Sequence, residues 1–177
     1  MRLQPADFDI AALFDALDAQ RRSRGLTWSG VAREIWDQSA ALNAVRADHP
    51  ISPSTLTGMA KRGDTTCQHA LFMLRWLRRT PESFLPGAKT DTPPARHPLI
   101  GPDRRLRWDL KKLHEALDAQ RRERSLTWAQ LAPKLQCSPS QLSGIGRARF
   151  AIGMKLAMRI VCWLDRPARD FIYAAKW

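Results

Sequence analysis

The chain has 177 residues, with 29 Lys and Arg against 17 Asp and Glu, and a formal net charge of +12 at pH 7. This excess favours a polyanionic partner, either nucleic acid or an acidic membrane surface, although the Arg usage of a high-GC genome would also produce it. The three cysteines are isolated and support neither a disulfide framework nor a zinc site. The lack of a signal peptide or long apolar run predicts a cytoplasmic protein without a membrane span.

The chain contains an internal repeat at a separation of one hundred residues. Leu13–Trp28 reads LFDALDAQRRSRGLTW and Leu113–Trp128 reads LHEALDAQRRERSLTW, with twelve of sixteen positions identical. A repeat of such long period indicates two copies of one folding unit, because a solenoid needs three or more stacked units to close its core.

A Pro-rich segment separates the two copies. Five of the twelve prolines fall between Pro86 and Pro102. We therefore predict a first domain over residues 7–85, a linker over 86–106 and a second domain over 107–173. An extended linker of this kind would span on the order of 50 Å.

Each copy is predicted to begin with two amphipathic helices. Apolar residues recur with helical spacing in the first helix, at Ile10, Leu13 and Leu17 and again at Leu110, Leu113 and Leu117. Asp18 and Asp118 are placed to form i,i+4 ion pairs with Arg22 and Arg122. Gly25 is expected to end the first helix, and Thr27 or Thr127 to cap the second, with Gln130 completing a capping box.

The remaining predicted elements are also helical. A third helix is predicted to start at Ser52-Pro53 in the first copy and at Ser138-Pro139 in the second. Its apolar residues should face inward; they are Leu56 and Met59, and Leu142 and Ile145. A fourth helix is expected over 67–77 and 152–164, with Trp76 and Trp163 in the core. A short fifth helix follows each and carries Phe84 or Phe171 inward. No alternating strand pattern is present, so the predicted class is all-α.

One long insertion distinguishes the copies. Residues 36–51 of the first copy stand where the second has only Gln136 and Cys137. Because Ile35, Leu42 and Val45 are roughly helix-spaced, we expect the second helix to continue into this arm for several turns.

The segment Thr127–Arg149, TWAQLAPKLQCSPSQLSGIGRAR, resembles the helix-turn-helix of the lambda-repressor-like XRE family. A small residue, Ala132 or Ala32, stands where the two helices of that motif touch. The resemblance covers both copies and implies two tandem five-helix lambda-repressor-like domains joined by the linker. The chain departs from the family at Gln136, where Gly is usual in the turn, at Pro133 inside the second helix, and at the 36–51 insertion.

The resemblance implies that the outer face of the third helix contacts double-stranded DNA in the major groove. The implied DNA-binding residues are Trp28, Ser52, Ser54, Thr55, Thr57, Lys61 and Arg62 in the first copy, and Trp128, Ser138, Ser140, Gln141, Ser143, Arg147 and Arg149 in the second. For the two tryptophans, core packing is the alternative, and for the others a solvated helix face. Gly58 and Gly144 indicate a close approach by either a neighbouring helix or a DNA backbone, because each costs about 1 kcal/mol in a helix.

The function expected is sequence-specific DNA binding by a transcriptional regulator that reads two unequal half-sites. The alternative is a protein-interaction module, antitoxin-like or docking the transcription machinery, that uses the 36–51 arm to bind a partner or another copy of the chain. The four histidines share no metal-ligand spacing, and no nucleophile, base and orienting group stand together. We assign no catalytic residue, metal or cofactor.

Overall fold

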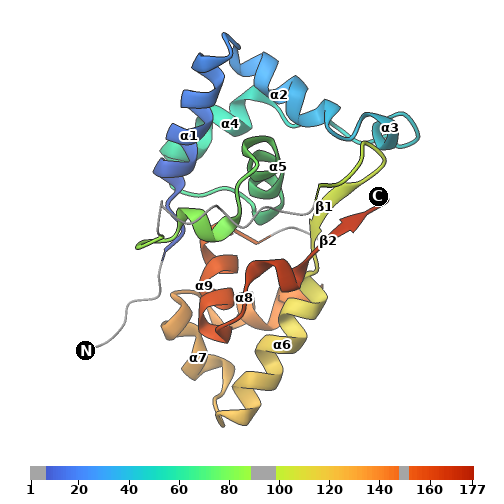
Figure 1. The fold of residues 1–177 in the computed structure, drawn as a ribbon. Coiled ribbons are helices and arrows are strands. Elements are labelled where there is room, and N and C mark those ends of the chain that lie inside the picture. Colours follow the sequence, from blue (N-terminus) through green and yellow to red (C-terminus); the bar gives the residue numbers. More distant parts are fainter. Residues whose placement is uncertain (1–6, 89–98, 148–151) are drawn as a thin grey trace.

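The computed structural model describes residues 7–88, 99–147 and 152–177, which are mostly helical with one small sheet (Figure 1). The elements of the first copy are α1 (Ile10–Ser23), α2 (Trp28–Asp37), α3 (Ala40–Asn43), α4 (Pro53–Arg62), α5 (Cys67–Leu77) and the 3₁₀ turn η1 (Pro81–Phe84). Those that follow are β1 (Arg105–Trp108), α6 (Leu110–Glu123), α7 (Trp128–Leu135), α8 (Pro139–Gly144), η2 (Ile145–Arg147), α9 (Met154–Leu164), η3 (Ala168–Phe171) and β2 (Ile172–Ala175).

The helix ends follow the capping residues that the sequence indicates. The Thr27 side chain accepts a hydrogen bond from the Gly30 amide at the start of α2, and Thr127 forms the expected capping box with Gln130 at the start of α7. Ser52 and Ser138 cap α4 and α8, each with proline at the first helical position. These ends are fixed by contacts within three residues, which is why the local sequence predicts them.

The predicted apolar stripes lie in the core. The side chains of Leu13, Leu17, Leu113 and Leu117 are fully buried. Trp76 is buried as well, whereas Trp163 is only half-buried, beneath the guanidinium of Arg124. The buried residues of both copies form one continuous cluster, so the two copies pack directly against each other.

The prediction of a strand-free chain is wrong at one place. Strands β1 and β2 form an antiparallel pair, with Arg105 opposite Ala175 and Trp108 opposite Ile172. β1 begins inside the segment predicted as linker, where Leu106 is buried and its carbonyl accepts a hydrogen bond from Gln68 in α5. Each strand has only four residues, too short for a visible alternation, and the pairing joins segments far apart in the chain.

The second helix does not continue through the insertion, so that expectation is also wrong. α2 ends at Asp37, and a single turn, α3, follows. Arg75 of α5 fixes this bend, because its guanidinium donates hydrogen bonds to the Gln38 carbonyl, the Ser39 hydroxyl and the Arg104 carbonyl at 2.7–3.1 Å. This half-buried guanidinium bonds to several acceptors and holds the arm against the segment that precedes β1.

Three smaller features differ in detail from the expected helices. α7 runs through Pro133 to Leu135, and Gln136 adopts the left-handed conformation (φ 54°) that glycine usually supplies in this turn. α8 ends at Gly144, so Ile145 and Arg147 lie in a 3₁₀ turn. The predicted fifth helices are the 3₁₀ turns η1 and η3, and they carry Phe84 and Phe171 into the core as expected.

Candidate nucleic-acid interface

Helices α4 and α8 are each anchored by two inward residues. Leu56 and Met59 of α4 are fully buried, and Leu142 and Ile145 fill the matching positions at α8 and η2. This prediction is confirmed in both copies. Because the apolar residues recur at i,i+3, the remaining side of each helix is directed away from the core.

The outer side of α4 carries four exposed residues of the predicted set, namely Ser54, Thr57, Lys61 and Arg62. The Arg62 guanidinium turns back along the helix and donates a hydrogen bond to the Thr55 carbonyl at 3.1 Å. The Ser52 hydroxyl accepts from the Thr55 amide at 3.2 Å, so this residue acts as the helix cap. Lys61 is the other exposed cation of α4, and no hydrogen bond like that of Arg62 to the helix backbone is seen for its side chain among the described residues.

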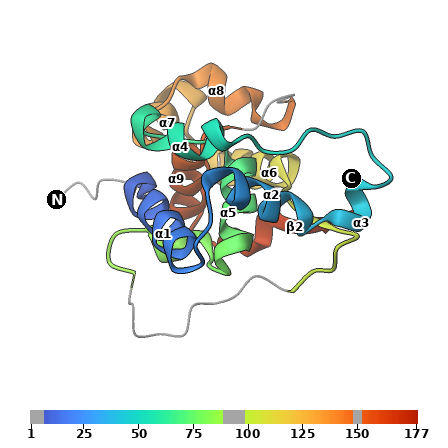
Figure 2. The same cartoon turned by 90° about the horizontal axis from the view of Figure 1, so that it is seen from above.

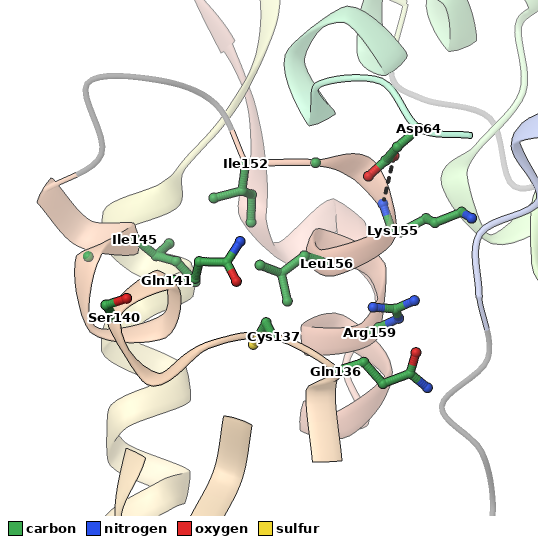
Figure 3. Close-up of a pocket in the computed structure, with 12 residues that line it drawn as sticks. Asp64, Gln136, Cys137, Ser140, Gln141, Ile145, Ile152, Lys155, Leu156 and Arg159 are labelled. Atoms are coloured by element: carbon green, nitrogen blue, oxygen red, sulfur yellow. Dashed lines mark hydrogen bonds between the residues drawn. The ribbon is translucent and has the colours of Figure 1, made fainter. Parts of the chain in front are cut away.

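The outer side of α8 has the same organisation with different side chains. Ser140, Gln141 and Arg147 are exposed, and Ser143 is half-buried. The Gln141 side-chain oxygen accepts a hydrogen bond from the Ser138 amide at 2.9 Å, and the side chain extends toward Leu156 of α9 (Figure 3). Arg149 lies outside the described residues.

The two tryptophans at the starts of α2 and α7 are packed on their own copies. Trp28 is half-buried and stacks on Phe14 with ring centroids 5.3 Å apart, while the Arg21 guanidinium lies 5.0 Å from its centre. Trp128 stacks on His114 at 5.6 Å, with Arg121 at 4.5 Å. Each indole is held by an aromatic ring and an arginine, an arrangement that accounts for its position without a ligand.

The two third helices lie on the same side of the molecule. In Figure 2, α4 and α8 are both in the upper part of the view, and residues 81–88 lie below them. In Figure 1, α4 is in the upper half and α8 in the lower half. The two helices are therefore separated along the molecule but lie on a common side of it.

The two helix glycines differ in their surroundings. Apart from its chain neighbours and the backbone of its own helix, a methyl group at Gly144 would have no described atom within 4 Å, so no other described helix packs closely there. At Gly58 the same methyl would clash with the Arg62 guanidinium. Close helix packing is thus absent among the described neighbours of Gly144, which faces open space beside Ser140 and Gln141.

The two copies meet at the starts of α5 and α9. The Cys67 amide donates to the Ile152 carbonyl at 2.7 Å, and the Met154 amide donates to the Thr65 carbonyl at 2.8 Å. Asp64 reinforces this junction, because its carboxylate accepts from its neighbour Thr65 and from the Lys155 amide of α9 (Figure 3).

A cavity of about 430 Å³ adjoins this junction on the side of the second copy (Figure 3). Its described lining comes from the α7–α8 turn, α8 and the start of α9, together with Asp64 from the first copy. Ile145, Ile152 and Leu156 form an apolar part, and Gln136 and Arg159 a polar one. Ser140, Gln141 and Gly144 of α8 also line it, so part of the side of α8 that carries the candidate residues is directly beside the contact between the copies.

Arg159 also joins the two copies. Its guanidinium donates to the Asp7 carboxylate at 2.5 Å and lies 3.4 Å from the Leu135 carbonyl. The hydrogen bond from Arg159 lowers the pKa of Asp7 despite the opposing effect of burial. Asp7, Asp64 and Arg159 are not among the residues that the sequence indicated. The one available signal was the Arg159 charge in α9, a helix that is apolar apart from this residue and Lys155 near its start, and it did not indicate a partner.

The apolar residues of the 36–51 arm are in contact with the rest of the chain. Leu42 and Ile51 are buried, and the guanidinium of Arg105 lies 4.8 Å from the ring centre of Trp36. Arg105 also donates to the carboxylate of Asp48 at 2.5 Å. Val45 is exposed, but the arm otherwise presents its apolar side to its own protein.

Comparisons of the chain with protein-family models, with curated proteins and with solved structures found no match. Within the described ranges, 7–88, 99–147 and 152–177, no helix combines the length and the apolar character that crossing a bilayer requires.

Proposed function

We propose that the protein binds double-stranded DNA in a sequence-specific manner, as a transcriptional regulator built from two tandem lambda-repressor-like helix-turn-helix units. The observation that carries this proposal is the placement of α4 and α8 on one side of the molecule, each anchored by buried apolar residues and each with exposed polar and cationic residues. The proposal includes the cytoplasmic location expected from the sequence.

The chemistry of the two helices suits a major groove. The groove is about 12 Å wide and accepts an α-helix. Lys61 and Arg147 are cations suited to phosphate oxygens or to the acceptor edge of guanine, and Ser140, Gln141 and Thr57 supply shorter hydrogen-bonding groups for base edges. The net charge of +12 supports attraction to the polyanion before specific contacts form.

Nothing specific favours the alternative function, in which the arm docks a protein partner. Such docking needs an amphipathic helix with an available apolar side. Here Leu42 and Ile51 are buried within the chain, and α3 is a single turn. We therefore carry DNA binding forward alone.

The test is selection of bound sequences from a pool of random duplexes by the full chain, at two salt concentrations. We expect a defined motif. For the variants K61A and R147A, we expect weaker binding to that motif and a salt dependence reduced by about one phosphate contact each. K176A is the matched control, because Lys176 is an exposed cation beyond β2. Weak binding without a motif, equally sensitive to all three substitutions, would contradict the proposal.

A further inference from the structure

The hydrogen bonds at the junction join equivalent positions of the two copies reciprocally. Cys67 is the first residue of α5 and Met154 the first residue of α9, and Thr65 and Ile152 each stand two positions earlier. The amide of Cys67 donates to Ile152, and the amide of Met154 donates to Thr65. Thr66 and Gly153, the residues between them, form an antiparallel bridge. Each copy thus uses the same segment to contact the same segment of the other.

Such reciprocal contacts are the mark of a two-fold relationship. Two copies related by a translation would join different surfaces, whereas copies related by a two-fold axis join the same surface to itself. Figure 1 shows the corresponding helices diagonally opposite: α1 is at the upper left and α6 at the lower right, and α2 is above right of the centre and α7 below left. The two copies are therefore related by an approximate two-fold axis that passes near Thr66 and Gly153.

This axis explains why α4 and α8 lie on one side of the molecule in Figure 2. A two-fold axis that points out of that side reverses the direction of one third helix relative to the other. A DNA duplex has local two-fold axes perpendicular to its length, and a protein with a two-fold axis of its own aligns with one of them. Half-sites read in this way run in opposite directions along the sequence.

The junction also fixes the separation of the two third helices. The Trp108 indole of the second copy donates to the Cys67 carbonyl of the first at 3.0 Å, and both groups are buried. The Ala168 amide donates to the Glu82 carboxylate at 2.7 Å, again across the two copies. Because the buried residues of both copies form one cluster, these contacts hold the copies at one distance from each other.

We propose that one chain reads a single operator composed of two inverted, unequal half-sites at one fixed spacing. This inference rests on the proposed DNA binding and adds the orientation, the spacing and the stoichiometry of the site. The half-sites are inverted because of the two-fold relationship. They are unequal because Thr55, Thr57 and Lys61 of the first copy correspond to Gln141, Ser143 and Arg147 of the second. The spacing is fixed by the hydrogen-bonded junction.

The experiment makes the two reading helices alike within the full chain. The variant T55Q/T57S/K61R gives α4 the outer residues of α8, and the new Gln at position 55 stands three residues after the Ser52 cap, as Gln141 does after Ser138. Sites are selected from random duplexes with the wild type and with this variant, and folding of both is checked by circular dichroism. We expect an imperfect inverted repeat for the wild type and a more nearly perfect palindrome for the variant.

A second measurement uses the wild type alone and does not depend on the variant folding. Designed duplexes carry the selected operator with one half-site reversed, or with the two half-sites moved apart by roughly half a helical turn, about 5 base pairs. We expect each change to weaken binding about tenfold or more, because one half-site is then out of reach, and we expect one chain per intact operator. A direct repeat, a single half-site, or tolerance of the altered spacing overturns this inference but leaves DNA binding in place. The absence of any selected motif overturns both.

Discussion

The carboxylate of Asp64, in the residues that follow α4, accepts a hydrogen bond from the backbone amide of Lys155 at the start of α9, at 3.3 Å. The N-cap residue of α9 is Gly153, which has no side chain to satisfy an amide of the first turn. A residue of one copy therefore caps a helix of the other. Because Asp64 is two residues beyond the end of α4, this contact also connects the proposed reading helix to the junction.

We expect D64A to destabilise the protein by about 1 kcal/mol, the usual effect of removing a helix cap. D64N should lose less, because its amide oxygen still accepts a hydrogen bond. The measurement is the free energy of unfolding from urea titration. D103A is the control, since the Asp103 side chain is largely exposed and makes only a 3.5 Å contact with Arg104. Equal stability of D64A and D103A would show that the cross-copy cap contributes nothing.

Gly153, the N-cap residue of α9, lies beside the Asp64 carboxylate in the second copy. A methyl group there would clash with the nearer carboxylate oxygen of Asp64, and that carboxylate is held by two backbone amides. G153A is therefore expected to destabilise the protein by about 1–3 kcal/mol through overpacking. In the double variant D64A/G153A the clash is removed. Its loss of unfolding free energy should therefore be smaller than the sum of the losses measured for D64A and G153A separately. Additive losses in the urea titrations would contradict the contact.

The substitution G144A is expected to change stability and DNA affinity in opposite directions. Since a methyl group at this position meets no described atom of another residue within 4 Å, G144A should stabilise α8 by up to about 1 kcal/mol. If a DNA backbone approaches this face, the same substitution should lower affinity for the selected operator several-fold. Thermal unfolding and fluorescence anisotropy measure the two effects. A rise in stability with unchanged affinity would remove Gly144 from the interface.

The pairing of Asp48 with Arg105 predicts a dependence of stability on pH. The hydrogen bond from the Arg105 guanidinium lowers the pKa of Asp48 below its ordinary value of 3.8. Because the folded state holds the charged form, this stabilisation is present above the unfolded pKa and is lost as pH falls through the folded one. D48N should therefore cost about 1 kcal/mol at pH 7, and the difference from the wild type should shrink toward pH 3 and below.

The measurement for this pair is the free energy of unfolding of the wild type and D48N between pH 7 and pH 2.5. Asp7 and Asp118, whose pKa values are also lowered by arginines, contribute equally to both proteins and cancel in the difference. A difference that stays constant over this range would show that the Asp48 charge does not stabilise the arm.

Much of each copy was predictable because its determinants are local. The capped starts of α2, α4, α7 and α8 depend on side chains three residues from the amides they satisfy. The buried positions Leu56 and Leu142 follow from spacing along a helix. The residues of the candidate interface were identified by the same spacing, because they are the polar residues of the third helices that do not occupy inward positions.

The arm and the sheet were not predictable because their determinants are distant in sequence. α2 ends where Arg75, more than thirty residues later, binds the Gln38 carbonyl. β1 exists because Arg105–Trp108 pairs with Ile172–Ala175 near the other end of the chain. Helical spacing of Ile35, Leu42 and Val45 suggested a continuous helix, yet Val45 is exposed and a long-range contact decides the bend.

The sequence by itself determined that the protein consists of two related helical copies, where most helices begin, and which residues face inward. Tertiary structure alone decided how the copies meet. The repeat does not distinguish a translation from a two-fold axis, because the same hundred-residue separation fits both. The reciprocal hydrogen bonds of Cys67 with Ile152 and of Met154 with Thr65 select the two-fold arrangement, since backbone groups removed from water at the junction require partners and the equivalent segment supplies them.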